Sequence, residues 1–168
     1  FGTSGGDTGA TPTSLASADQ VNRAPQLDPQ GFSGDEDTLI TGQIIATDIE
    51  NDALTYSLVG QPTNGTITLD PITGSFVYTP NANYNGPDSF IVTVTDDHGN
   101  STTTTMGLTI VSVNDAPVSN DQSLTTPEDT PVTGQVVATD VEGDTLSYTI
   151  STTATSGTVT LNPATGAL

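Results

Sequence analysis

The amino-acid sequence predicts an all-β protein, in which β-sandwiches of about seven strands follow one another in tandem. Apolar residues alternate along strand-length runs, as at Phe90, Val92 and Val94, and this period of two turns one face of a strand toward a core. The sequence also occurs twice, because Glu36-Asp37-Thr38 recurs as Glu128-Asp129-Thr130 at an offset of 92 residues (128 − 36). That offset is the size of a small domain, so we expect a string of similar domains.

Seven strands are expected in the complete copy, residues 21–112. Asn, Asp, Gly and Pro separate the alternating runs and mark the turns between them. The expected strands lie near residues 30–34, 38–46, 53–59, 65–69, 75–79, 88–95 and 102–112. Since no segment shows a helical period, the pattern indicates an antiparallel sandwich.

Two local features carry their own predictions. Asn64-Gly65 between two runs predicts a tight hairpin turn. Tyr84 lies shortly before the run that begins near residue 88, where its hydroxyl would tie a loop to the backbone as a tyrosine corner. The alternative for Tyr84 is a partly buried residue of the surface.

The chain divides into three parts. Residues 1–20 consist largely of Gly, Ser, Thr and Ala and are expected to form a flexible leader or linker. Residues 113–168 align with 21–76 without a gap, so they are expected to form an incomplete second repeat in a piece of a longer chain. Half a sandwich exposes open edges. We therefore expect it to be completed either by the parent chain or by strands from another molecule.

The charge and the composition exclude several classes of partner. There are 20 acidic residues against one Arg, and the net charge is −19, so phosphates of nucleic acids and anionic membranes are repelled. No apolar run is long enough for membrane insertion. The absence of Cys excludes disulfides and thiolate metal sites.

Most acidic residues fall in four motifs, three of which occur in both copies. They are Glu36-Asp37-Thr38 and its twin, Asp48-Ile49-Glu50-Asn51-Asp52 and Asp140-Val141-Glu142-Gly143-Asp144, the linkers Asn22-Arg23-Ala24-Pro25 and Asn114-Asp115-Ala116-Pro117, and Asp96-Asp97-His98-Gly99. Oxygen ligands at such spacing suit a hard cation, and Ca²⁺ accepts six to eight of them in flexible geometry. Solvated turn residues are the alternative, since Asp and Asn favour turns. Their repetition at one offset favours calcium.

In these motifs the chain resembles the cadherin-like tandem repeats of large secreted bacterial adhesins and biofilm surface proteins. The resemblance rests on Pro127-Glu128-Asp129-Thr130, Ala138–Asp144, Tyr78–Gly86, Asp88-Ser89-Phe90 and Val113–Pro117. It implies an Ig-like or cadherin-like Greek-key sandwich with calcium at each junction. Carried over residue by residue, the junction ligands would be Glu36, Asn114, Asp115, Asp140, Glu142 and Asp144, and those at the start of the first repeat Asp48, Glu50 and Asp97.

Two departures from that family pattern change the expectation. Arg23 stands where the second linker has Asp115, and a guanidinium replaces a ligand and repels a cation. We therefore expect the first junction to bind calcium weakly or not at all. The Leu-Asp-Arg-Glu motif of cadherins is also missing, because that region reads Thr79-Pro80-Asn81, so one or two ions per junction are expected rather than three.

The function expected from these features is structural. The chain would be a calcium-stabilised rod segment of a secreted, extracellular cell-surface adhesin or matrix protein, and its partners would be neighbouring repeats of its parent chain. An alternative is a filament subunit in which other copies complete the second repeat with a strand. Residues 1–20 would be the natural donor, although they lack alternating apolar residues.

Two further functions are less well supported by the sequence. A glycan-binding module usually presents exposed aromatic residues, and this chain has four Tyr and four Phe, mostly at expected core positions. An enzyme is not expected, because there is no Cys and no Gly-x-Ser-x-Gly motif. The single His, His98, precedes a turn Gly and is expected to be solvated.

Overall fold

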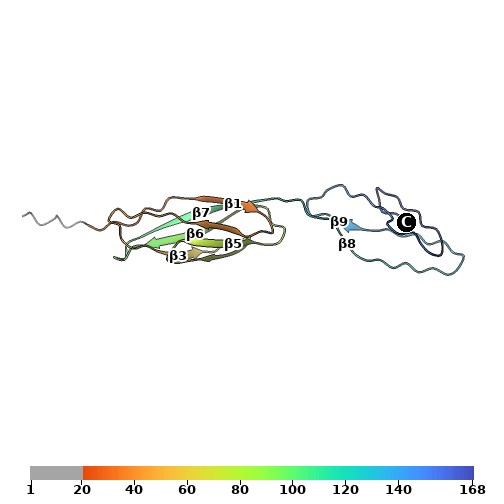
Figure 1. The fold of residues 1–168 in the computed structure, drawn as a ribbon, viewed down its shortest axis with the longest axis horizontal. Helices are drawn as coiled ribbons and strands as arrows, with labels where there is room; N and C mark the ends of the chain where they lie inside the picture. The colour runs from red at the N-terminus through yellow and green to blue at the C-terminus, as the bar shows by residue number, and fades with distance from the viewer. Residues whose placement is uncertain (1–20) are drawn as a thin grey trace, which may run out of the picture.

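A computed structural model describes residues 21–168, which contain nine strands and no helix. In residues 21–112, the first repeat, the strands are β1 (Gly31–Asp35), β2 (Ile40–Gln43), β3 (Thr55–Gly60), β4 (Gly65–Leu69), β5 (Ser75–Pro80), β6 (Gly86–Thr95) and β7 (Ser101–Val111). The two others, β8 (Val118–Ser119) and β9 (Ala138–Thr139), lie in residues 113–168, the second repeat (Figure 1). The seven expected strands are confirmed to within a few residues. The expectation for residues 1–20 lies outside the described residues.

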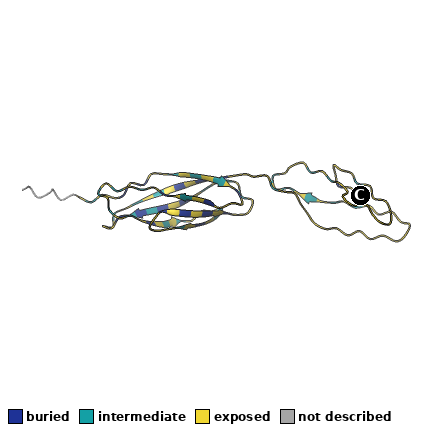
Figure 2. Ribbon diagram, in the orientation of Figure 1, coloured by how far each residue is buried: buried dark blue, intermediate teal, exposed yellow. Residues whose placement is uncertain are grey.

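The first repeat is a two-layered β-sandwich, which confirms the predicted all-β fold. One sheet has the strand order β1-β7-β6-β3 and the other β2-β5-β4. Alternate side chains of both sheets meet in one core, drawn in dark blue in Figure 2. At its centre Tyr78, Val92, Val94 and Met106 are 0% exposed, and each such side chain contributes about 1.5–3 kcal/mol by its burial.

One pairing differs from the antiparallel expectation. β1 pairs with β7 in parallel, from Gly31 opposite Gly107 to Asp35 opposite Val111. The period of two reports which face of a strand is buried but not the direction of its neighbour, so the sequence pattern did not reveal this pair. As a result, the chain enters the domain at one end and leaves it at the other (Figure 1).

The hairpin predicted at Asn64-Gly65 is wrong. The strands on either side of it, β3 and β4, belong to different sheets, so this segment crosses between layers. The Asp88 carboxylate on β6 holds the crossing, since it accepts hydrogen bonds from the backbone N–H groups of Thr63 at 3.0 Å and Asn64 at 2.8 Å. A bond made across 24 residues of sequence leaves no local signal.

Tyr84 has the hydrogen bond expected of a tyrosine corner. Its hydroxyl donates to the backbone oxygen of Pro87 at 2.6 Å. The side chain is partly buried against the core, so it ties the loop before β6 to the body of the domain.

The second repeat keeps the turns of the first but little of its sheet. β8 and β9 pair over two residues each, and most of residues 113–168 are exposed (Figure 2). Even so, Val136 N–H donates to Gly166 O at 2.8 Å, just as Ile44 N–H donates to Gly74 O at 2.9 Å, 92 residues earlier (136 − 44). Among the described residues, no helix is long and apolar enough to cross a membrane.

Candidate metal centres

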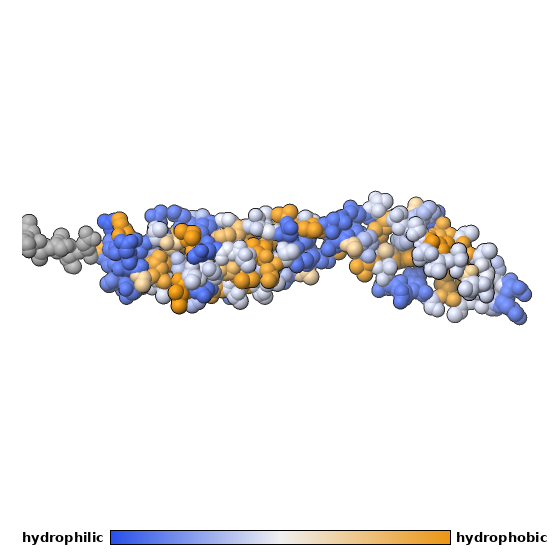
Figure 3. Space-filling model, viewed as in Figure 1, coloured by the Kyte–Doolittle hydropathy of each residue, from blue (hydrophilic) through white to orange (hydrophobic). Residues whose placement is uncertain are grey.

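Carboxylates from both repeats gather around the linker between them. We call Glu36, Asp37, Asp115, Asp140 and Glu142 the junction cluster. Burial, followed by the negative charges of Glu142, Asp37, Glu36 and Asp140, raises the pKa of Asp115. The four other carboxylates therefore lie close enough to Asp115 to disfavour its negative charge, which a cation would offset. Figure 3 shows hydrophilic residues around this linker and at the start of the first repeat.

Asp115 and Glu142 are the best candidates for ligands at the junction. Glu142 Oε2 accepts a hydrogen bond from the backbone N–H of Asp115 at 3.1 Å, which joins the linker to the loop after β9. Glu142 Oε1 and Asp115 Oδ2 are both buried and have no hydrogen-bond partner. An unpaired buried carboxylate oxygen is costly, and a hard cation is the natural partner for two of them.

Glu36 fastens the linker to the first repeat. Its side chain is buried, with the residue 2% exposed, and Oε1 accepts from Val113 N–H at 2.8 Å while Oε2 accepts from Asn85 Nδ2 at 3.3 Å. The Val113 bond, opposed by burial and helped by Asn85, lowers the pKa of Glu36. Glu36 therefore stays ionised beside the other carboxylates.

The remaining junction predictions lie at the edge of this cluster. Asn114 and Asp144 are exposed. The Asn114 side-chain amide donates to Asp115 O at 3.2 Å, and the Asp144 backbone N–H donates to Asp140 Oδ1 at 2.9 Å. Within residues 21–168, no hydrogen bond joins the Asp144 carboxylate to the cluster.

Asp37 was missed as a site residue. It adopts a left-handed backbone conformation, with φ of 57°, and its Oδ1 accepts from Asn83 N–H at 3.0 Å. Its neighbour Glu36 was predicted as a ligand from the motif that both share. Because both acids recur as Glu128-Asp129, the motif offered Asp37 as a candidate ligand beside Glu36.

A second acidic group, the leading cluster, lies at the start of the first repeat and consists of Asp48, Glu50, Asp52, Asp96 and Asp97. Ligand oxygens of Asp48, Asp52 and Asp96 lie within 4.8 Å of one another. Asp48 Oδ1 accepts from the backbone N–H groups of Glu50 at 2.9 Å and Asp52 at 3.2 Å. Asp48 Oδ2 and Glu50 Oε2 are buried without a partner, so this cluster, like the junction cluster, contains two unpaired carboxylate oxygens.

Asp96 was missed in favour of its neighbour Asp97. Asp96 is 5% exposed, and Asn22 Nδ2 donates to its Oδ2 at 2.8 Å. Burial raises the pKa of Asp96, but hydrogen bonds from Asn100, His98 and Asn22 outweigh it and leave that pKa lowered. The alternation of buried and exposed residues along β6 indicates that Asp96 faces inward. It continues the buried series of Val92 and Val94, whereas Asp97 is exposed.

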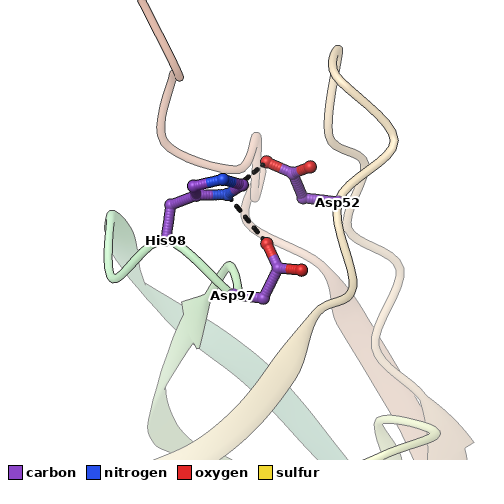
Figure 4. A group of neighbouring side chains, drawn as sticks. All are labelled: Asp52, Asp97 and His98. Atoms are coloured by element: carbon purple, nitrogen blue, oxygen red, sulfur yellow. Dashed lines mark hydrogen bonds and ion pairs between the residues drawn. The ribbon is translucent and has the colours of Figure 1, made fainter.

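His98 closes the outer side of the leading cluster. Its Nδ1 lies 3.1 Å from Asp52 Oδ2 and 2.8 Å from Asp97 Oδ1 (Figure 4). The negative charges of Asp52 and then Asp97 raise the pKa of His98. The side chain is 59% exposed, as expected, but it is paired rather than only solvated.

Arg23 lines a shallow pocket of about 360 Å³ that also contains Asp48 and Thr47. It forms no ion pair with another residue of the described part of the chain. The weak calcium binding expected from Arg23 at the leading cluster stays a prediction.

The fold is that of cadherin-like and Ig-like sandwiches. The chain is similar to a structure of Drosophila N-cadherin EC1-4, with a TM-score of 0.51 and 24% identity over 71% of this chain and 34% of that one. It is also similar to the protocadherin GammaB4 extracellular domain, with a TM-score of 0.50 and 17% identity over 86% of this chain and 28% of that one. At these identities the likeness shows the fold alone.

The chain belongs to the bacterial Ig domain family, whose model matches residues 22–109 and again 114–168. Sphingomyelinases of Mycobacterium tuberculosis and Mycobacterium bovis are 34% identical to it over 82 residues, which is 45% of this chain. The match covers 17% of the length of those enzymes. The family and the fold suggest a non-catalytic domain, although these curated relatives are enzymes.

Proposed function

We propose that the chain is a calcium-stabilised rod segment of a secreted, extracellular cell-surface protein of the adhesin or matrix type, with neighbouring repeats as its partners. One observation carries the proposal. Four buried carboxylate oxygens have no hydrogen-bond partner, and they fall two in each acidic cluster, on Asp48, Glu50, Asp115 and Glu142. The bacterial Ig domain family fits a surface location.

The residues present fit calcium better than other metals. Within residues 21–168, all the buried side-chain polar atoms without a partner are carboxylate oxygens, which suit a hard cation of flexible coordination. At the junction Glu36, Asp115, Asp140 and Glu142 would hold the ion, with Asn114 and Asp144 at the rim. In the leading cluster Asp48, Glu50, Asp52 and Asp96 would do so, with Asp97 outside. A bound calcium would supply positive charge to the carboxylate oxygens that have no hydrogen-bond donor.

The effect of such binding would be mechanical. Glu36 follows β1, Asp115 lies in the linker, and Asp140 and Glu142 follow β9. Ligands from three separate segments would restrict the angle between the repeats. Extracellular calcium modules have dissociation constants of roughly 10⁻⁴–10⁻³ M, so the hinge would stiffen outside cells.

Thermal unfolding with calcium and with chelator tests this function. If calcium is present at about ten times its dissociation constant, binding adds about 1.4 kcal/mol, which raises Tm of a domain of this size by about 6 °C or more. Magnesium at the same concentration is the control and should shift Tm less. Superimposable melts in calcium and chelator would remove the proposal.

A filament subunit is the second candidate, and an open groove in the second repeat favours it. The groove, of about 390 Å³, is lined by Val136, Ala138, Leu146, Tyr148 and Leu161 among others. The equivalent residues of the first repeat, Ile44, Ala46, Leu54, Tyr56 and Leu69, belong to or pack on its core. A strand from another copy would cover this groove. Light scattering at rising concentration separates the candidates, because a strictly monomeric chain would exclude the filament.

A further inference from the structure

The leading cluster contains two groups of possible metal ligands that share one carboxylate. Ligand atoms of Asp48, Asp52 and Asp96 lie within 4.8 Å of one another, and so do those of Asp52, Asp97 and His98. We call the first set the inner group and the second set the outer group. The inner group offers oxygen alone, whereas the outer group adds an imidazole nitrogen. The two groups therefore differ in the metal that they suit.

The outer group brings three ligand atoms from two loops to one point (Figure 4). His98 Nδ1 lies 2.8 Å from Asp97 Oδ1 and 3.1 Å from Asp52 Oδ2. Zinc bonds of about 2.0–2.2 Å to nitrogen and oxygen separate the ligand atoms of one tetrahedron by roughly 3.3–3.6 Å. Small rotations of these side chains would therefore open the outer group far enough to hold an ion of that size.

The inner acids hold the backbone of the outer ligands in place. Asp48 Oδ1 accepts a hydrogen bond from the backbone N–H of Asp52 at 3.2 Å, and Asp96 Oδ1 accepts one from the backbone N–H of His98 at 2.9 Å. Asp52 lies between β2 and β3, and His98 lies in the turn between β6 and β7. Each of the two loops is thus anchored to an acid of the inner group, and the outer ligands meet at a defined place.

The electrostatic surroundings favour a dication at the outer group. The negative charges of Asp52 and then Asp97 raise the pKa of His98, and the same charges attract a metal ion. An ion that takes the lone pair of Nδ1 releases the proton held there and brings one more positive charge than that proton. His98 pairs with neither Asp48 Oδ2 nor Glu50 Oε2, which stay buried without a partner in the same cluster.

We propose that the outer group, Asp52, Asp97 and His98, is a binding site for a divalent transition metal such as Zn²⁺, separate from the calcium position of the inner group. Imidazole nitrogen suits zinc, copper and nickel, whereas calcium takes oxygen ligands. His98 is the single histidine of the sequence, and there is no Cys. A bound ion would join the loop before β3 to the turn after β6, and water would complete its coordination. This inference goes beyond the rod function, because it needs no calcium.

The single histidine gives the proposal a direct spectroscopic test. The ¹⁵N NMR spectrum of the imidazole in the tag-free, full chain contains the signals of His98 alone. Zinc added in the presence of excess calcium should move the Nδ1 signal strongly and the Nε2 signal little, because Nδ1 faces both carboxylates. A response through Nε2 would indicate adventitious binding to an exposed histidine and would overturn the proposal. The absence of any response would overturn it as well.

Zinc affinities of matched variants sharpen the test, and isothermal titration calorimetry in excess calcium measures them. His98→Asn should weaken zinc binding at least tenfold, and Asp97→Asn should weaken it several-fold, since each removes one ligand atom. Asp121→Asn removes an exposed acid elsewhere in the chain, so it is the control and should bind zinc as the unaltered chain does. Equal affinities in all four proteins would assign the zinc to surface carboxylates in general and reject the site.

The zinc and calcium experiments separate this site from the proposed function. Superimposable melts in calcium and chelator, together with a zinc-dependent shift of the Nδ1 signal, would reject the calcium-stabilised rod and keep the outer site. A calcium-dependent Tm without any response of His98 to zinc would reject the outer site alone.

Discussion

Residues 21–76 and 113–168 have the same turns in very different surroundings. Tyr56 N–H donates to Pro71 O at 2.9 Å, and Tyr148 N–H donates to Pro163 O at the same distance. Asp37 and Asp129 share a φ of 57°. Yet Tyr56 is buried against the core, whereas Tyr148 lines an open groove. Turn geometry is therefore encoded within each turn, while strands and burial require partners from elsewhere in the sequence.

Those partners are β6 and β7. They supply Phe90, Val92, Val94, Met106 and Leu108 to the core of the first repeat. Residues 113–168 contain two short strands, β8 and β9, which pair with each other in place of two sheets. Matched substitutions in the two copies can test this interpretation.

The largest difference is expected from removing the same tyrosine in each copy. Tyr56→Ala deletes a buried ring, 9% exposed, and should cost the first repeat about 3 kcal/mol of unfolding free energy. Tyr148→Ala removes a half-exposed ring and should cost less than about 1 kcal/mol. Chemical denaturation followed by circular dichroism measures both. Equal losses would show that the second repeat has a core of its own.

A smaller loss of unfolding free energy is expected from substituting Asp88, which lies on β6 of the first repeat. Its carboxylate accepts from Thr63 N–H, Asn64 N–H and the Tyr78 hydroxyl, so Asp88→Ala should cost about 2 kcal/mol. Burial opposes ionisation of Asp88, but the hydrogen bonds from Thr63, Asn64 and Ser89 outweigh it and lower its pKa.

The lowered pKa gives this contribution a definite pH dependence. A carboxylate with a depressed pKa stabilises the folded state above its unfolded pKa, near 4, and this stabilisation is lost as the pH falls through the folded pKa. Asp88→Asn should therefore flatten the fall of Tm below about pH 4. Asp121→Asn, at an exposed position, is the control. An unchanged acid profile in Asp88→Asn would contradict the assignment.

The smallest expected effect compares the two linkers. Arg23 and Asp115 are equivalent positions (115 − 23 = 92) beside clusters of similar acids. Arg23→Asp should tighten calcium binding at the leading cluster by about tenfold, and Asp115→Arg should weaken it at the junction by a similar factor, each about 1.4 kcal/mol. Isothermal titration calorimetry measures both. An Arg23→Asp variant with unaltered affinity would show that Arg23 does not limit that cluster.

The sequence predicted most of the fold because alternation and turn residues are local signals. All seven strands of the first repeat follow from runs such as Phe90, Val92 and Val94. The parallel β1–β7 pair and the crossing at Asn64-Gly65 were not predicted, because both depend on contacts between distant segments. Asp88, which fixes that crossing, looks like an ordinary strand residue in the sequence.

The sequence motifs predicted where the acidic clusters lie, but not which side chains of each motif are buried. Repetition at one offset pointed to Asp48, Glu50 and Glu142, and the cadherin-like linker motif pointed to Asp115; these four residues have the buried unpartnered oxygens. The motif named Asp97 but not the buried Asp96, because the inward face of β6 was not followed past residue 94; each of the two lies in a group of possible metal ligands. Whether these residues bind calcium stays a prediction.

The direction of β7 relative to β1 also determines how far a series of such domains extends. Because the chain leaves each sandwich at the end opposite to the one where it enters, every added copy would add its full length to the series. β7 alone has 11 residues, or roughly 36 Å at the usual rise per residue. An antiparallel first and last strand would return the chain to its starting side, and successive copies would stack as a compact bundle.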